Sequence, residues 1–180
     1  MSRTTFPTAA VALAGSVLLL AGCASTPAPA PEESTVYTAQ SVANPNGGPD
    51  ATELIREDGG AAVYEQHMVA LNACDWDAIM AQYPDQAEIL FPGAVTIVGR
   101  EEIADLFAGF VKTHEEGGLC GITFTEEHRQ VIGGTLSIQW VAEADFLAEP
   151  YRGSDAYISD DGLMVSMVST FDGDELQFKE

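Results

Sequence analysis

The chain has 180 residues, a hydrophobic fraction of 46% and a mean hydropathy of +0.05. These values predict one ordinary domain with a packed core, and they exclude disorder along the whole chain. Its 28 acidic residues outnumber the 7 basic ones and give a net charge of −21. A chain this acidic, without a cluster of lysines and arginines, repels phosphate backbones, so we expect no nucleic-acid partner.

The first 22 residues have the pattern of a secretory signal. Arg3 is followed by an uncharged stretch whose apolar run, residues 11–20, is too short to cross a membrane. The sequence Leu20-Ala21-Gly22-Cys23 that comes next resembles the lipobox of bacterial lipoproteins. The resemblance implies cleavage after Gly22 and a diacylglyceryl group on the sulfur of Cys23. The alternative is an ordinary signal peptide with an incidental cysteine.

A lipid at Cys23 would make a membrane the first partner of the protein. We therefore expect it in the bacterial cell envelope, anchored on the extracytoplasmic side of an inner or outer membrane. Residues 23–52 are rich in proline and alanine and lack helical or strand periodicity, which predicts a tether. Residues 53–180 then form a single domain.

Helical periodicity follows the tether. Tyr64, Met68 and Leu71 repeat at helical spacing, which predicts one amphipathic helix over residues 53–73. Asp75 can cap a second, short helix that ends at Pro84. A short strand is expected over residues 87–91. A third helix after Gly99 has one apolar face, made of Ile103, Leu106, Phe107, Phe110, Val111 and His114.

After Gly117-Gly118 the periodicity becomes that of strands. Alternating patterns predict strands over residues 122–131, 136–146, 151–159 and 163–171. Gly133-Gly134 and Asp160-Asp161-Gly162 predict the turns between neighbouring strands. Three N-terminal helices packed on an antiparallel meander make an α+β domain.

Two short motifs link this order of elements to a known family. The first, at residues 98–103 (Val-Gly-Arg-Glu-Glu-Ile), opens the third helix, and the second, at residues 160–165 (Asp-Asp-Gly-Leu-Met-Val), forms the last hairpin. Over residues 55–180 their order and spacing resemble the SnoaL-like branch of the nuclear transport factor 2-like superfamily. The resemblance implies a cone, in which a strongly curved antiparallel sheet wraps round a helix and leaves a pocket at the open end.

The same resemblance leaves the activity open. Related cones include ketosteroid isomerase, scytalone dehydratase, polyketide cyclases and binding proteins, and homodimers are common among them, so the fold alone does not select a function. The enzymes place an acid–base side chain inside an apolar pocket, where burial tunes its pKa. This sequence holds no nucleophile motif, phosphate loop or zinc signature, and we expect no metal or cofactor.

Asp155 and Tyr157 are the first candidates for acid–base chemistry. They lie two residues apart on one strand and therefore share a face. With Asp155 inside the pocket, the pair would remove a proton from a carbon acid and donate a hydrogen bond to the enolate that forms. Ala156 and Ile158 favour the opposite orientation of the strand equally well.

The histidines are the second candidates. His114 continues the apolar face of the third helix and would then point into the pocket, although a residue in the last helical turn is also favoured by the helix dipole. His128 shares a strand face with Glu126, and an exposed position at the strand end fits it equally well. His67 lies beside the apolar stripe of the first helix.

Trp140 is predicted to line the pocket. It stands in the middle of a strand whose one face is strictly apolar, so its indole should point into the cone beside Phe107 or Phe110. Its buried N–H then needs a carbonyl or hydroxyl partner. Tyr64 and Met68 should join the same wall, which suits a small apolar or aromatic molecule.

Cys74 and Cys120 are expected to form a disulfide. They are the two cysteines left once Cys23 carries lipid, export exposes them to oxidising conditions, and both lie near ends of predicted elements.

Two functions stay open at this point. The first is that the cone binds a small apolar ligand or a protein partner. The alternative is a cofactor-independent isomerase, dehydratase or cyclase. An inward acid or histidine in an apolar cavity would favour the enzyme, whereas a cavity filled by side chains such as Trp140 would favour the structural or interaction role.

Overall fold

The computed structural model describes residues 37–179, and the expected signal segment and Cys23 lie outside this range. The described elements are, in chain order, β1 (Tyr37–Val42), β2 (Ala51–Leu54), α1 (Gly60–Ala73), α2 (Trp76–Met80), β3 (Glu88–Phe91), β4 (Val95–Val98), α3 (Arg100–Phe110), β5 (Thr123–Ile132), β6 (Thr135–Glu143), β7 (Tyr151–Asp160) and β8 (Leu163–Phe171). Three 3-10 turns join them, η1 (Pro92–Ala94), η2 (His114–Glu116) and η3 (Gly173–Glu175).

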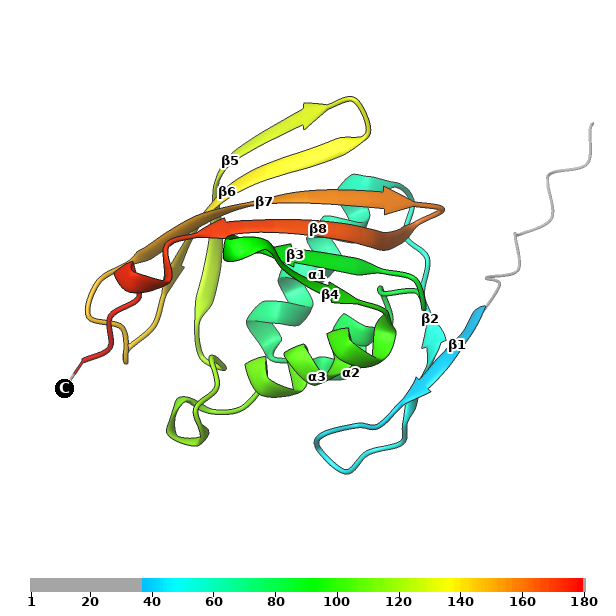
Figure 1. The fold of residues 1–180 in the computed structure, drawn as a ribbon, viewed down its shortest axis with the longest axis horizontal. Coiled ribbons are helices and arrows are strands. Elements are labelled where there is room, and N and C mark those ends of the chain that lie inside the picture. Colours follow the sequence, from blue (N-terminus) through cyan, green and yellow to red (C-terminus); the bar gives the residue numbers. More distant parts are fainter. Residues whose placement is uncertain (1–36, 180) are drawn as a thin grey trace, which may run out of the picture. The chain divides into compact units, whose positions relative to one another are not determined.

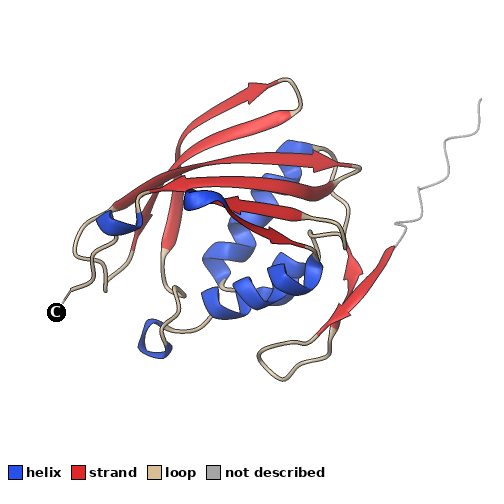
Figure 2. Ribbon diagram, in the orientation of Figure 1, coloured by secondary structure: helices blue, strands red, loops and turns tan. Residues whose placement is uncertain are grey.

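Six of the strands form one curved sheet, in the order β4-β3-β8-β7-β6-β5. The three α-helices lie on its concave side, as Figures 1 and 2 show. Strands β5 to β8 pair antiparallel in sequence order, as the alternating pattern and the turns predict. The expectation of an antiparallel sheet is wrong at one place, because β3 pairs parallel to β8 and makes the sheet mixed.

The helices do not all precede the sheet, which corrects the expected order of three N-terminal helices followed by strands. β3 and β4 separate α2 from α3, and β1 and β2 come before α1. β4 was not expected at all. The chain reverses direction at Pro92-Gly93 after β3, and the four residues of β4 then pair antiparallel with β3. Because β4 is the edge strand, α3 begins at the edge of the sheet.

A hairpin replaces part of the expected tether. β1 and β2 pair antiparallel, and their side chains Ala39, Val42 and Leu54 are buried. Because β2 occupies residues 51–54, the first helix begins at Gly60 and not at Glu53. The proline-rich composition of residues 23–52 conceals this hairpin, since each strand buries only one or two apolar residues.

Arg100 ties this hairpin to the domain. Its guanidinium is fully buried at the start of α3 and donates to the backbone carbonyls of Gln40 and Ala51 in the hairpin. The same group donates to the carbonyl of Met80, the last residue of α2, and to that of Tyr83 just after the helix. One side chain of the predicted helix-opening motif thus satisfies carbonyl groups of three separate segments.

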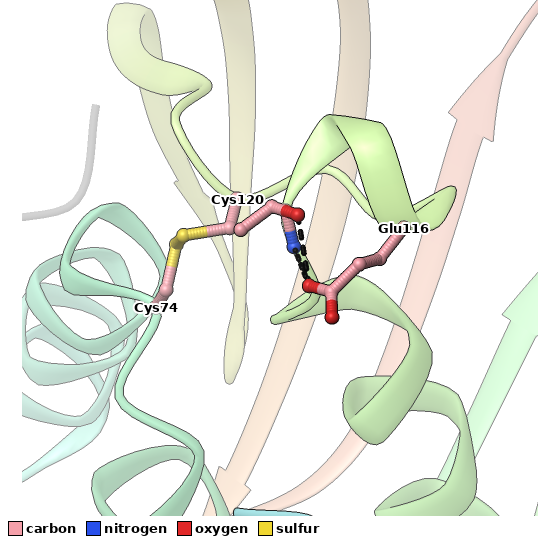
Figure 3. The surroundings of a disulfide bond; sticks show 4 residues. Cys74, Glu116 and Cys120 are labelled. Carbon is pink, nitrogen blue, oxygen red and sulfur yellow. Dashed lines mark hydrogen bonds between the residues drawn. A yellow bond between two sulfur atoms is a disulfide. The ribbon is translucent and has the colours of Figure 1, made fainter.

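The predicted disulfide is present. Cys74 ends α1 in the left-handed conformation, with φ of 53° and with Cα 5.7 Å from that of Cys120. Figure 3 shows the bond joining the end of α1 to the segment between η2 and β5. The expected cap of α2 is also confirmed, because the Asp75 side chain accepts from the backbone N–H of Ala78 at 3.0 Å. Within residues 37–179, no helix is long and apolar enough to cross a membrane.

Candidate functional site

A cavity of about 380 Å³ lies between the concave face of the sheet and the helices. Its wall is mainly aromatic and aliphatic, with contributions from α1, α3, the sheet and the segment after β8. Four residues of the predicted pocket lie on this wall, namely Met68, Phe107, Phe110 and Trp140. The fifth, Tyr64, is buried but does not line the cavity. Its ring packs against the ring of Tyr157, with 5.1 Å between the centroids, and against the guanidinium of Arg129.

Trp140 faces the cavity, as its strand pattern predicts, and is 5% exposed. Its aromatic neighbours are Phe124 at 5.3 Å and Tyr151 at 5.8 Å between ring centroids, and not the expected Phe107 or Phe110. Gly153 stands opposite it on β7, and a Cβ there would overlap the indole. The absence of a side chain at Gly153 therefore leaves the space that the Trp140 ring occupies.

The indole N–H of Trp140 binds a carboxylate, where a carbonyl or hydroxyl was expected. It donates to Oδ2 of Asp155 at 2.9 Å. Tyr157 Oη donates to the same oxygen at 2.8 Å, and Ser169 Oγ donates to Oδ1 at 2.6 Å. Asp155 and Tyr157 thus point into the cavity from β7, and the alternative orientation with Ala156 and Ile158 inside is excluded.

Burial governs the protonation of this cluster. It raises the pKa of Asp155 above its ordinary value, and the hydrogen bonds from Ser169, Tyr157 and Trp140 oppose the rise. Burial and the nearby Asp155 charge raise the pKa of Tyr157 well above that of a free tyrosine, so its hydroxyl keeps the proton that it donates. The result is a carboxylate of raised basicity held by three donors on an apolar wall.

His67 is the second titratable group on the cavity wall. It is fully buried on α1, and its Nδ1 lies 3.0 Å from Oε1 of Gln82. Burial lowers the pKa of His67 to about 4, so the ring is neutral at physiological pH. Its Nε2 has no hydrogen-bond partner among the described residues.

His114 does not point into this cavity, which corrects the expectation from the helical face. α3 ends at Phe110, and His114 begins the separate turn η2. Its ring stacks on Phe146, with centroids 4.2 Å apart, and on Phe178 at 4.9 Å. It borders a second, open hollow at the molecular surface and takes no part in the Asp155 cluster.

His128 is exposed, and the expected pairing with Glu126 is absent. The register of β5 against β6 shifts between these two residues, so the simple alternation that would place them on one face is interrupted. Glu126 instead forms an ion pair with Arg129 at 2.8 Å. His128 lies outside the cavity wall.

Ser169 and Gln82 were not singled out from the sequence, and His67 was considered there only as a residue beside the apolar stripe of the first helix. His67 lies three residues after Tyr64 and four before Leu71, which places it on the buried stripe of α1, and this spacing is a usable signal. Ser169 alternates with Met167 and Phe171 on β8, all facing inward. Gln82 follows α2 in an irregular segment, and no pattern in the sequence marks it.

The curved mixed sheet, the helices on its concave side and the apolar cavity define an α+β cone of the nuclear transport factor 2-like class. A model of the SnoaL-like domain family matches residues 64–167, more than half of the chain, and the protein belongs to that family. No curated protein sequence matches the chain.

Solved structures share the fold at low sequence identity. A nuclear transport factor 2-like protein of unknown function from Cytophaga hutchinsonii is 12% identical, with a TM-score of 0.51 over 66% of this chain and 95% of that one. An epoxide hydrolase of Mycobacterium tuberculosis is 18% identical, with a TM-score of 0.50 over 63% and 83%. A protein assigned as a polyketide cyclase from Sinorhizobium meliloti is 13% identical, with a TM-score of 0.50 over 60% and 93%. These likenesses establish the fold.

Proposed function

We propose that the cone binds a small, mainly apolar molecule and transfers a proton on it without a cofactor, with Asp155 as the proton acceptor. The observation that carries this proposal is the position of Asp155, a carboxylate on the wall of an otherwise apolar cavity, with Tyr157, Trp140 and Ser169 donating to it. The reaction class is that of an isomerase, dehydratase or cyclase.

The surroundings of Asp155 suit a general base. Burial raises its pKa, which brings its basicity nearer to that needed at neutral pH. The three donors hold the carboxylate in one orientation before a substrate arrives. Once Asp155 takes a proton it accepts hydrogen bonds less well, and the hydroxyl of Tyr157 or Ser169 becomes free to donate to negative charge on the substrate.

The open volume of the cavity favours ligand binding and proton transfer over a purely structural or interaction role. The Trp140 ring lies against Gly153 of β7, and a cavity of about 380 Å³ remains beside it. Cavities of this size hold small organic molecules. An acid on such a wall is costly to bury, and a role in proton transfer accounts for its presence.

Exchange of carbon-bound hydrogen tests the proposal without knowledge of the natural substrate. 2-Tetralone is a small apolar ketone whose α-hydrogens exchange with D2O, and NMR follows their loss. We expect the full-length chain to accelerate this exchange, and Asp155→Asn to lower the acceleration by about 100-fold or more, as for loss of a general base. Asp160→Asn, an exposed acid on the same strand, is the matched control. Equal rates for Asp155→Asn and the unchanged protein would refute the proposal.

We also propose that the protein is anchored to a membrane of the bacterial cell envelope by a lipid on Cys23. The support is the sequence of the signal segment and its lipobox-like end. The disulfide between Cys74 and Cys120 supports the same location, since such bonds persist in oxidising compartments.

A further inference from the structure

The side-chain hydroxyl and indole donors on the cavity wall already have acceptors. Trp140, Tyr157 and Ser169 donate to Asp155, and Tyr151 Oη donates to the backbone carbonyl of Asp172 at 2.9 Å. One acceptor on the wall, Nε2 of His67, has no partner among the described residues, whereas the carboxylate of Asp155 already accepts from three donors.

The tautomer of His67 follows from its neighbour Gln82. The side-chain amide nitrogen of Gln82 donates to the carbonyl of Val63 at 3.2 Å, so its oxygen is the end that faces His67. An oxygen can only accept, and Nδ1 of His67, 3.0 Å away, must carry the hydrogen. The opposite nitrogen, Nε2, then presents a bare lone pair. Reversing the amide would set its oxygen against the carbonyl oxygen of Val63.

A bare, buried acceptor on an apolar wall calls for a donor from the ligand. Leaving such an acceptor unpaired is costly, and a ligand hydroxyl that pairs with it recovers this cost. A ligand with carbonyl groups alone would leave Nε2 of His67 unpaired, because a carbonyl oxygen cannot donate. A cationic amine would have to shed its hydration in an apolar cavity, where three donors already balance the charge of Asp155.

We infer that the natural ligand of this cavity is a neutral, hydroxylated apolar ring compound whose O–H donates to Nε2 of His67. This inference rests on the proposed function, and it narrows the ligand of the same cavity from apolar molecules in general to phenols, enols and ring alcohols. His67 acts here as a specificity residue that selects the hydroxylated form of a compound over its methylated equivalent.

A pair of nearly isosteric naphthalenes tests this selection. We expect the full-length chain to bind 2-naphthol about tenfold or more tightly than 2-methylnaphthalene, as measured by isothermal titration calorimetry. His67→Phe keeps a ring but removes the acceptor, so it should weaken 2-naphthol binding about tenfold and leave 2-methylnaphthalene binding nearly unchanged. Val69→Ala, at an exposed position on the same helix, is the matched control and should preserve the preference.

A second measurement uses the unchanged protein and therefore tests the inference even if His67→Phe fails to fold. The ¹⁵N resonances of the His67 ring in the unchanged protein should show hydrogen on Nδ1 and none on Nε2. Addition of 2-naphthol should shift the Nε2 resonance, and addition of 2-methylnaphthalene should not. Hydrogen found on Nε2 in the free protein would overturn the inference.

The outcomes separate this inference from the proposed function. Equal affinity for the two naphthalenes overturns the inference alone, and so does tighter binding of 2-(aminomethyl)naphthalene, a cation, than of 2-naphthol. Binding of none of these compounds overturns both. A preserved preference for 2-naphthol, together with full tetralone exchange by Asp155→Asn, overturns only the proton-transfer function.

Discussion

At the scale of single residues, the amide of Gln82 determines how His67 meets the cavity. The hydrogen bond to Val63 orients the amide, and the amide in turn holds the His67 ring. The ring is otherwise surrounded by aromatic side chains, with Tyr83, Phe107 and Tyr157 within 6.1 Å between centroids. Such surroundings solvate an imidazolium poorly, which is why burial lowers the pKa of His67 to about 4.

This lowered pKa makes the stability of the protein depend on pH. The unfolded chain takes up a proton at His67 as the pH falls through 6.5, whereas the folded chain does so only near pH 4. The stability that His67 contributes is therefore present above pH 6.5 and is lost as the pH falls towards 4. Between pH 7 and pH 4.5 we expect a loss of about 2 kcal/mol in the free energy of unfolding from this residue.

Urea unfolding at the two pH values measures the effect. His67→Gln should lose about 2 kcal/mol less than the unchanged protein over the same interval. Asp155 has a raised pKa and acts with the opposite sign, because the folded state binds its proton more readily, but both proteins carry it and its contribution cancels. The same pH dependence in both proteins would contradict the burial of a neutral His67.

Only part of this site could be predicted from the sequence, residue by residue. The pairing of Asp155 and Tyr157 on one face follows from alternation, but which face points inward does not, since Ala156 and Ile158 are as apolar as an inner face requires. The fit of Trp140 against Gly153 on the neighbouring strand identifies the inner face. That fit joins residues on two strands, and single-strand periodicity carries no information about it.

At the scale of elements, the long periodic segments were predictable and the short ones were not. β6, β7 and β8 repeat their apolar residues often enough to show a period of two, and the Asp160-Asp161-Gly162 turn places the last hairpin. β2 and β4 have four residues each, too few for a period to appear. They form strands because they pair with another strand, β2 with β1 and β4 with β3.

Arg100 provides a test of how the β1–β2 hairpin is held. Replacing it with Met removes a buried cation and leaves the carbonyls of Gln40, Met80 and Tyr83 without their donor. We expect the free energy of unfolding to fall by about 3 kcal/mol, measured by urea denaturation. Limited proteolysis should also cut within residues 37–54 sooner.

The control for this change is the adjacent residue Glu101, which is exposed on the same helix. Glu101→Gln should alter stability by no more than about 0.5 kcal/mol. A loss below about 1 kcal/mol for Arg100→Met, with unchanged cleavage of the hairpin, would show that the apolar side chains of β1 and β2 suffice to hold it.

At the scale of the whole molecule, charge and the expected lipid act in opposite directions. Cleavage after Gly22 removes Arg3 and no acidic residue, so the charge of −21 becomes −22. Such a chain is repelled by anionic lipid head groups. Membrane attachment would therefore depend on the acyl chains at Cys23, each buried methylene of which contributes about 0.8 kcal/mol.

Cys23→Ser tests the anchor directly. In its native host, the unchanged protein should sediment with membranes and enter the detergent phase, whereas the variant should be found almost entirely in the soluble fraction, because its charge offers no second means of attachment. Ser25→Ala, two residues further on, should behave as the unchanged protein. Mass spectrometry of the purified protein completes the test: an unacylated N-terminus, or a Cys23→Ser variant that stays with the membranes, would rule out a lipid anchor at this cysteine.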